Sequence, residues 1–226
     1  VYYTFDYSVL LATKIIRTAA DLDVLKITNG KSIYGYYVLG ADIDMKKATI
    51  SQKPGDNNYW EGSLGFRGVF DGQNHTISDF IAGENGLFGH IGKDAKIKDV
   101  KFTKVSYSGQ YRAALLARAI IGAELSNISI EVIDFGTPDK GVVPYDRGLL
   151  ASRYIDGSII KDVKIDASAC TVYSLFGNQV GDKAANIYSG VEIKVKAYTM
   201  FANQGNDVNA SDKKIAPAGV NIVVVA

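Results

Sequence analysis

Short stretches of alternating apolar and polar residues dominate the sequence, and they recur at a nearly regular spacing. An apolar pair followed by a small residue occurs five times, with start-to-start spacings of 28, 34, 26 and 25 residues. Almost no stretch has the periodicity of an amphipathic helix. A repeat of this length predicts a fold of equivalent stacked units. The five copies are Leu87-Phe88-Gly89, Leu115-Leu116-Ala117, Leu149-Leu150-Ala151, Leu175-Phe176-Gly177 and Met200-Phe201-Ala202.

A second strand-like pattern follows each of the first three apolar pairs, over residues 97–102, 125–130 and 160–165. Two such short strands cannot bury an apolar face alone, whereas parallel stacking aligns their apolar side chains inside a coil. We therefore predict an all-β fold, a right-handed parallel β-helix with a short N-terminal capping helix. An antiparallel β-sandwich is the alternative, because it also contains short alternating strands.

One polar residue is expected at the same corner of successive coils, where its side chain can bond the nearby backbone and hold the bend. The Asp or Asn lies 12, 12 and 13 residues after the first Leu of the apolar pair, and an earlier partial copy supplies a fourth member. These corner residues are Asp79, Asp99, Asn127 and Asp162.

The beginning of the chain carries the one persuasive helical pattern, over residues 18–26. Thr18 and Asp21 have the spacing of a capping box, and Leu22 and Leu25 share one face. We place this helix as a lid on the first coil and divide the chain into an N-terminal strand and capping helix, 1–31, and a β-helix domain, 32–226. Residues 1–16 are read either as an additional strand or as a segment that enters from a neighbouring domain.

Composition narrows the function classes. The chain has 25 Lys and Arg against 24 Asp and Glu in 226 residues, so it has no long-range field that would attract nucleic acid or an anionic membrane. No run of about 20 apolar residues is present, so membrane insertion is not expected. The single Cys170 cannot form an internal disulfide, and we interpret it as a small buried side chain rather than a nucleophile. Because the chain begins at Val1, we read it as an excised or processed piece.

Three segments near the middle of the first half carry a family resemblance. They read YYVLGADIDM over 36–45, FRGVFDGQNHTISDF over 66–80 and GLFG over 86–89. They resemble the GLUG-type right-handed β-helix modules of bacterial surface proteins, adhesins and the non-catalytic regions of exported proteases. The resemblance covers residues 18–165 well and the remainder loosely. It implies an extracellular or cell-surface protein that is part of a larger multidomain chain, and it implies no catalytic residue.

A row of polar side chains just after the apolar pairs is the main candidate binding site. Arg and Gln side chains can bond sugar hydroxyls or carboxylates, while Tyr rings stack on sugar faces, so such a row suits a polysaccharide. A solvated sheet face is the alternative interpretation. The row comprises His90, Arg118, Arg153, Gln179 and Gln204, and Tyr173 and Tyr198 each precede their apolar pair by two residues.

Two further candidates lie in the first half of the chain. Tyr59 and Trp60 occupy a long insertion and could form a ligand platform, or the indole could pack on the first coil. Asp42, Asp44 and Asp71 form a weak candidate calcium site, whose alternative is a set of turn and edge hydrogen bonds.

These features favour a non-catalytic bacterial surface or secreted module that acts in adhesion, in binding a glycan or host surface protein, or as a spacer. A polysaccharide lyase or glycoside hydrolase is the alternative, because both chemistries occur on β-helices. Either enzyme needs clustered carboxylates, and no cluster falls in register beside the candidate basic residues. We therefore expect no enzyme activity and no cofactor. The candidate bases are Arg112, Arg118, Arg147 and Arg153.

Overall fold

The computed structural model describes residues 12–26, 32–48, 65–108, 112–136, 146–176, 179–180, 186–200 and 216–225. This part of the chain is nearly all β, as predicted. The largest sheet has the order β1 (Lys14–Ile16), β2 (Tyr36–Leu39), β4 (Val69–Asp71), β8 (Lys96–Tyr107), β11 (Glu124–Asp134), β14 (Ile159–Ser174), β17 (Val191–Met200) and β18 (Val220–Val224). Four short strands pair at its sides, namely β3 (Ile43–Asp44), β5 (Thr76–Ser78), β6 (Ile81–Ala82) and β16 (Ile187–Ser189).

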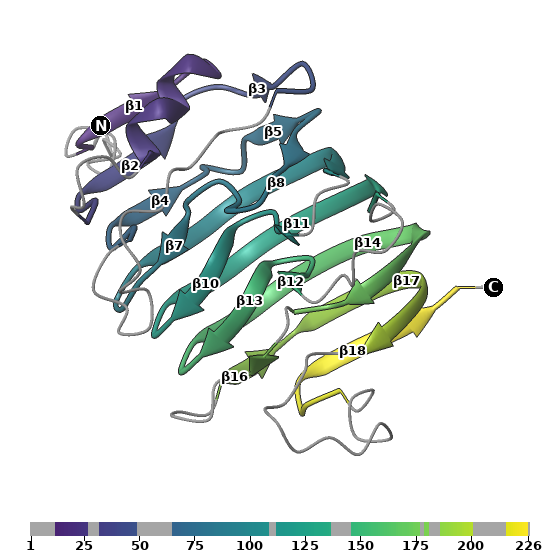
Figure 1. The fold of residues 1–226 in the computed structure, drawn as a ribbon. Helices are drawn as coiled ribbons and strands as arrows, with labels where there is room; N and C mark the ends of the chain where they lie inside the picture. Colours follow the sequence, from purple (N-terminus) through teal and green to yellow (C-terminus); the bar gives the residue numbers. More distant parts are fainter. Residues whose placement is uncertain are drawn as a thin grey trace, which may run out of the picture.

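Two smaller sheets complete the architecture. One contains β7 (His90–Ile91), β10 (Ala117–Ile121), β13 (Ala151–Asp156) and β15 (Gln179–Val180), and the other pairs β9 (Arg112–Ala113) with β12 (Asp146–Arg147). The layer of β7, β10 and β13 lies over β8, β11 and β14 (Figure 1). Ile91, Ile120 and Ile155 are paired across the first three strands of this layer and are buried in the core.

All strand pairs within the described residues are parallel, so an antiparallel sandwich is excluded for this part of the chain. The second strand-like patterns pair in register, because Leu125 lies opposite both Ile97 and Ile160. Ile130 likewise lies between Phe102 and Ile165, and all three are buried. Equivalent apolar positions therefore stack from one repeat unit to the next, as the repeat predicted.

The apolar pairs also stack on one another through backbone hydrogen bonds. The Leu87 N–H donates to the Leu115 carbonyl, and the Leu149 N–H donates to the Leu175 carbonyl. The Leu and Phe side chains of the first four copies are all buried. The fifth copy departs by one residue, because Met200 pairs with Ser174 instead of Leu175.

Left-handed backbone forms the predicted corner in three successive units. Asp99, Asn127 and Asp162 have φ values of 54°, 51° and 51°, a region that Asn, Asp and Gly tolerate best. Gly190 and Gly219 continue this corner with φ of 63° and 85°, since their neighbours in β16, β17 and β18 are in register with β14. The corner is therefore made by residue types that accept positive φ.

Asp79 was assigned to the wrong corner. Thr76 pairs with Lys101 and Ser78 with Thr103, so Asp79 (φ 54°) aligns with Lys104 (φ 53°) at a second corner. The corner of Asp99 is continued in the preceding unit by the turn around Gly72, whose N–H donates to the Lys98 carbonyl. The extra residues of this turn displaced the sequence alignment.

The N-terminal helix is a 3₁₀ helix, η1 (Ala20–Leu25), rather than an α-helix. The predicted capping box is confirmed: the Asp21 N–H donates to Thr18 Oγ1 at 3.2 Å, and the Thr18 N–H donates to Asp21 Oδ2 at 3.0 Å. Leu22 and Leu25 are buried in the core, and η1 lies beside β1 at the N-terminal end of the stack (Figure 1).

Strand β1 pairs with β2 and so extends the large sheet, although we assigned β1 to a separate N-terminal segment. The division at residues 31 and 32 stays a prediction. Within the described ranges, no helix combines the length and the apolar character that a membrane span would need.

Candidate functional site

The predicted polar row lies on the sheet of β7, β10, β13 and β15. His90 pairs with Ala119, Ala119 pairs with Tyr154, and Tyr154 pairs with Gln179. His90 and Gln179 therefore share one row, as the sequence predicted, and Ala119 and Tyr154 are the members between them.

Arg118 and Arg153 each precede this row by one residue, which corrects their predicted register. The cause is an irregularity between β10 and β13, where Ala117 pairs with Ala151 but Ala119 pairs with Tyr154. Two residues of β13, Ser152 and Arg153, therefore lie opposite Arg118 alone. Such a bulge redirects side chains and cannot be read from the repeat spacing.

The basic side chains of this sheet are shielded from solvent. His90 is 3% exposed and Arg118 is 9% exposed, while Arg153 is half-buried. Burial lowers the pKa of His90 to about 4, and the positive charges of Arg118 and Arg153 lower it further. His90 is therefore neutral at pH 7, and its two arginine neighbours carry the charge. We call His90, Arg118 and Arg153 the basic cluster.

The two tyrosines do not form the predicted aromatic column. Tyr198 pairs with Val172, and Met200 pairs with Ser174, so Tyr173 lies one residue out of step with Tyr198. Successive residues of a strand point to opposite faces, which separates the two rings. The register between β14 and β17 shifts between Ala167 and Thr171, and this irregularity causes the mismatch.

Tyr59, Trp60 and Gln204 lie outside the described residues, and their proposed binding roles stay predictions. The same holds for the second candidate loop, residues 137–145.

The three candidate calcium ligands have separate partners. Asp42 Oδ1 accepts a hydrogen bond from the Thr76 N–H at 2.8 Å and lies 3.1 Å from His75 Nδ1. Asp44 Oδ1 accepts from the Lys46 N–H at 2.9 Å. The described residues contain no group of three acidic, His or Cys side chains suited to a metal ion. The alternative of turn and edge hydrogen bonds describes Asp42 and Asp44.

Asp71 belongs instead to a polar ladder that runs across neighbouring units. Its carboxylate is 1% exposed, accepts a hydrogen bond from the Tyr36 hydroxyl at 2.7 Å and contacts the Lys98 ammonium group. Lys98 Nζ also lies 2.9 Å from Asp99 Oδ2, and the Asn127 side-chain amide donates to Asp99 Oδ1 at 2.7 Å. We call Asp71, Lys98, Asp99 and Asn127 the corner ladder.

Opposing effects set the pKa values in the corner ladder. Burial opposes ionisation of Asp71, but hydrogen bonds from Lys98, Tyr36 and Gln73 outweigh it and hold the pKa of Asp71 below 3.8. Burial also disfavours the charged Lys98, yet its hydrogen bonds to Asp71 and Asp99 raise the pKa of Lys98 overall. Lys98–Asp99 had been interpreted as ordinary surface pairing. The register of Asp71 with Lys98 is the signal that would have revealed the ladder.

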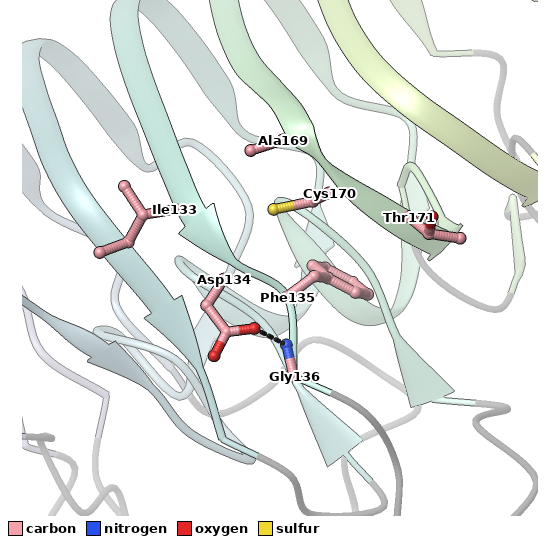
Figure 2. Close-up of a pocket in the computed structure, with 7 residues that line it drawn as sticks. All are labelled: Ile133, Asp134, Phe135, Gly136, Ala169, Cys170 and Thr171. Atoms are coloured by element: carbon pink, nitrogen blue, oxygen red, sulfur yellow. Dashed lines mark hydrogen bonds between the residues drawn. The ribbon is translucent and has the colours of Figure 1, made fainter. Parts of the chain in front are cut away.

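A pocket of about 260 Å³ lies where β11 and β14 separate, after the last paired residues, Glu131 and Asp166. Figure 2 shows the Cys170 sulfur pointing toward the strand that carries Asp134, whose Oδ1 accepts a hydrogen bond from the Gly136 N–H. Cys170 is 5% exposed, its thiol lies 3.7 Å from the Val132 carbonyl, and burial raises its pKa. Cys170 is thus a protonated, buried side chain, as predicted.

Arg147, one of the candidate bases, is buried at 1% exposure. Its guanidinium group contacts the Phe135 carbonyl, lies 3.5 Å from the Gly136 carbonyl, and stands 5.2 Å from the centre of the Phe135 ring. Arg147 therefore holds the end of β11 in place. The side chain of Arg112 lies outside the described residues.

Comparisons of the chain with protein-family models, with curated proteins and with solved structures found no match. The GLUG-type resemblance therefore stays a prediction. Chemically, the carboxylates considered above, Asp42, Asp44 and Asp71, bond to backbone or basic groups, whereas Arg118 and Arg153 bring two positive charges to one place. This arrangement is better suited to binding an anion than to acid and base catalysis.

Proposed function

We propose that this chain is a right-handed parallel β-helix module of an exported bacterial surface protein, and that it works without catalysis as a rigid support with a glycan-binding face. The single observation that carries the proposal is the in-register parallel stacking of successive units along the large sheet. A solenoid of this kind presents a long, fixed surface, which suits an extended ligand.

The state of the candidate acidic residues supports binding over catalysis. A hydrolase on this fold needs a carboxylic acid and a carboxylate across one sugar bond, and a lyase needs clustered carboxylates for calcium beside a base. Asp71 instead forms a buried ion pair with Lys98, and Asp42 bonds to the Thr76 backbone. Lyase or hydrolase activity is therefore the second hypothesis, and a host surface protein is the alternative partner.

Binding and turnover can be measured on the same samples. We expect isothermal titration calorimetry with a panel of neutral and acidic polysaccharides to give a saturable signal for at least one of them. Products of the same mixtures, analysed by reducing-sugar and ultraviolet assays with and without Ca²⁺, should not accumulate. Turnover of any polysaccharide would contradict the non-catalytic role.

The rigid support is tested separately. Small-angle X-ray scattering should give an elongated, rod-like particle, and a crystal structure should give right-handed coils. A spherical particle or left-handed winding would contradict the proposed architecture.

A further inference from the structure

We propose that the basic cluster binds the carboxylate group of an acidic sugar, so that the glycan recognised by this module contains uronic acid. This inference rests on the proposed glycan-binding function and adds the ligand class and the place where it binds. The cluster is formed by neighbouring strands of one sheet, with His90 on β7, Arg118 on β10 and Arg153 on β13.

The geometry suits an extended ligand. Adjacent strands of a sheet lie about 4.8 Å apart, so three strands span roughly 10 Å, which is the scale of two sugar units. The most exposed member, Arg153, lies at the rim, and Arg118 and His90 lie deeper. A sugar chain that runs along the stack can therefore meet a guanidinium group on two successive units.

The local charge is positive. Arg118 and Arg153 are the charged groups that act on His90, and both repel a proton there. The buried acid on β13, Asp156, supplies one negative charge against two guanidinium groups, which leaves an excess of one positive charge while His90 is neutral. Low solvent exposure strengthens such electrostatic attraction. Guanidinium groups match a carboxylate in a bidentate manner, which makes them selective for this anion.

The outer face of the large sheet differs in this respect. A groove of about 190 Å³ there is lined by Lys164, Lys194, Asp166 and Glu192, so its charges cancel. Lys96 and Glu124 form a further ion pair at 3.3 Å on the same sheet. The excess positive charge therefore distinguishes the basic cluster from the larger sheet surface.

The test compares polygalacturonate, which carries a carboxylate on each sugar, with the same polymer after full methyl esterification, which removes the charge and keeps the backbone. We expect calorimetric binding of polygalacturonate that weakens as salt rises, and at least tenfold weaker binding of the ester. Alginate tests whether other uronates bind. Dextran sulfate tests whether any polyanion suffices.

The matched variants are Arg153→Gln in the cluster and Lys161→Gln on the large sheet, since both remove one positive charge. We expect Arg153→Gln to weaken uronate binding at least tenfold and Lys161→Gln to leave it unchanged. Arg153→Lys keeps the charge but loses the bidentate geometry, and we expect it to lie between these two. Arg118→Gln should act like Arg153→Gln, provided that thermal unfolding shows a folded protein.

Several outcomes would overturn the inference. Equal binding of polygalacturonate and its ester would do so while leaving the glycan-binding function intact. Equal binding of dextran sulfate, or full binding by Arg153→Gln, would overturn the carboxylate assignment. Binding of no uronate polymer but of a neutral glycan would also reject it and would keep the proposed function. Binding of no glycan at all would reject both and leave only the support role, which scattering measures independently.

Discussion

The side-chain amide of Asn127 donates a hydrogen bond of 2.7 Å to Asp99, its counterpart in the preceding unit. Both residues adopt a left-handed backbone, with φ of 51° and 54°. The same residue column thus turns the chain and links consecutive units. We had expected corner side chains to bond the nearby backbone, whereas these two bond to each other.

The corner predicts a sharp dependence on residue type at Asp162. A β-branched residue is disfavoured at φ 51°, so Asp162→Val should lower the free energy of unfolding by about 1–2 kcal/mol. Asp162→Gly should be neutral or slightly stabilising, as Gly190 and Gly219 serve at this corner in the following units. Urea denaturation measures both values. Lys164→Val, on an exposed strand position, is the control, and equal effects of Val and Gly at 162 would refute the explanation.

Removal of the cation beside Asp71 should be costly, because the carboxylate is buried. We expect Lys98→Met to lower the free energy of unfolding at pH 7 by about 2 kcal/mol, less than for a fully buried pair since solvent screens the half-exposed Lys98. Lys101→Met, at an exposed position, should have little effect. Chemical denaturation of the two variants is the measurement. A similar stability for both would mean that the pair contributes nothing.

The same pair predicts a pH dependence. The folded-state pKa of Asp71 is lowered, so its stabilising contribution is present above the unfolded value, about 3.9, and is lost as the pH falls through the folded value. The difference in melting temperature between the native protein and Lys98→Met should therefore be largest near pH 7 and shrink toward pH 2. A difference that is constant over this range would contradict the assignment.

Tyr107 is expected to stabilise the core through one hydrogen bond. Its side chain is buried, and its hydroxyl donates to the Leu149 carbonyl at 2.6 Å. Tyr107→Phe removes the hydroxyl and leaves a buried carbonyl without this donor, so it should cost about 1–3 kcal/mol in thermal or chemical unfolding. Tyr34→Phe, at a position that is 63% exposed, should be neutral. Comparable losses in the two variants would rule out this hydrogen bond as the cause.

Cys170 should resist alkylation in the native protein. The thiol is buried, and its raised pKa keeps it protonated at neutral pH, while thiolates are the reactive form. Mass spectrometry after iodoacetamide treatment at pH 7.5 should show an unmodified native chain and a singly modified denatured chain. Rapid labelling of the native chain would place Cys170 in an open, reactive site.

The core was the most predictable part of the structure. Leu87, Leu115 and Leu149 were expected to be equivalent positions, and their buried side chains and backbone hydrogen bonds agree. Burial follows from residue type and spacing, because an apolar side chain that recurs in each unit has only the interior of the stack to occupy. The capping box of Thr18 and Asp21 was equally accessible, since both partners lie within four residues.

The candidate site was less predictable, because it depends on register. The bulge opposite Arg118 moved two arginines off the row of His90, and the shift in β14 separated Tyr173 from Tyr198. The ion pair of Asp71 with Lys98 joins residues 27 positions apart in the chain. No local pattern marks such a partner, and a slip of one residue moves a side chain to the opposite face.

The order of residues was thus sufficient to specify parallel-stacking strands, the apolar interior, the corner at Asp99, Asn127 and Asp162, and a buried Cys170. Only the folded chain decided which polar side chains meet, how deeply His90 is buried and which charges face it. The physical reason is that burial is a property of each residue and its period, whereas a polar contact needs two side chains in one register, and bulges set that register between strands far apart in sequence.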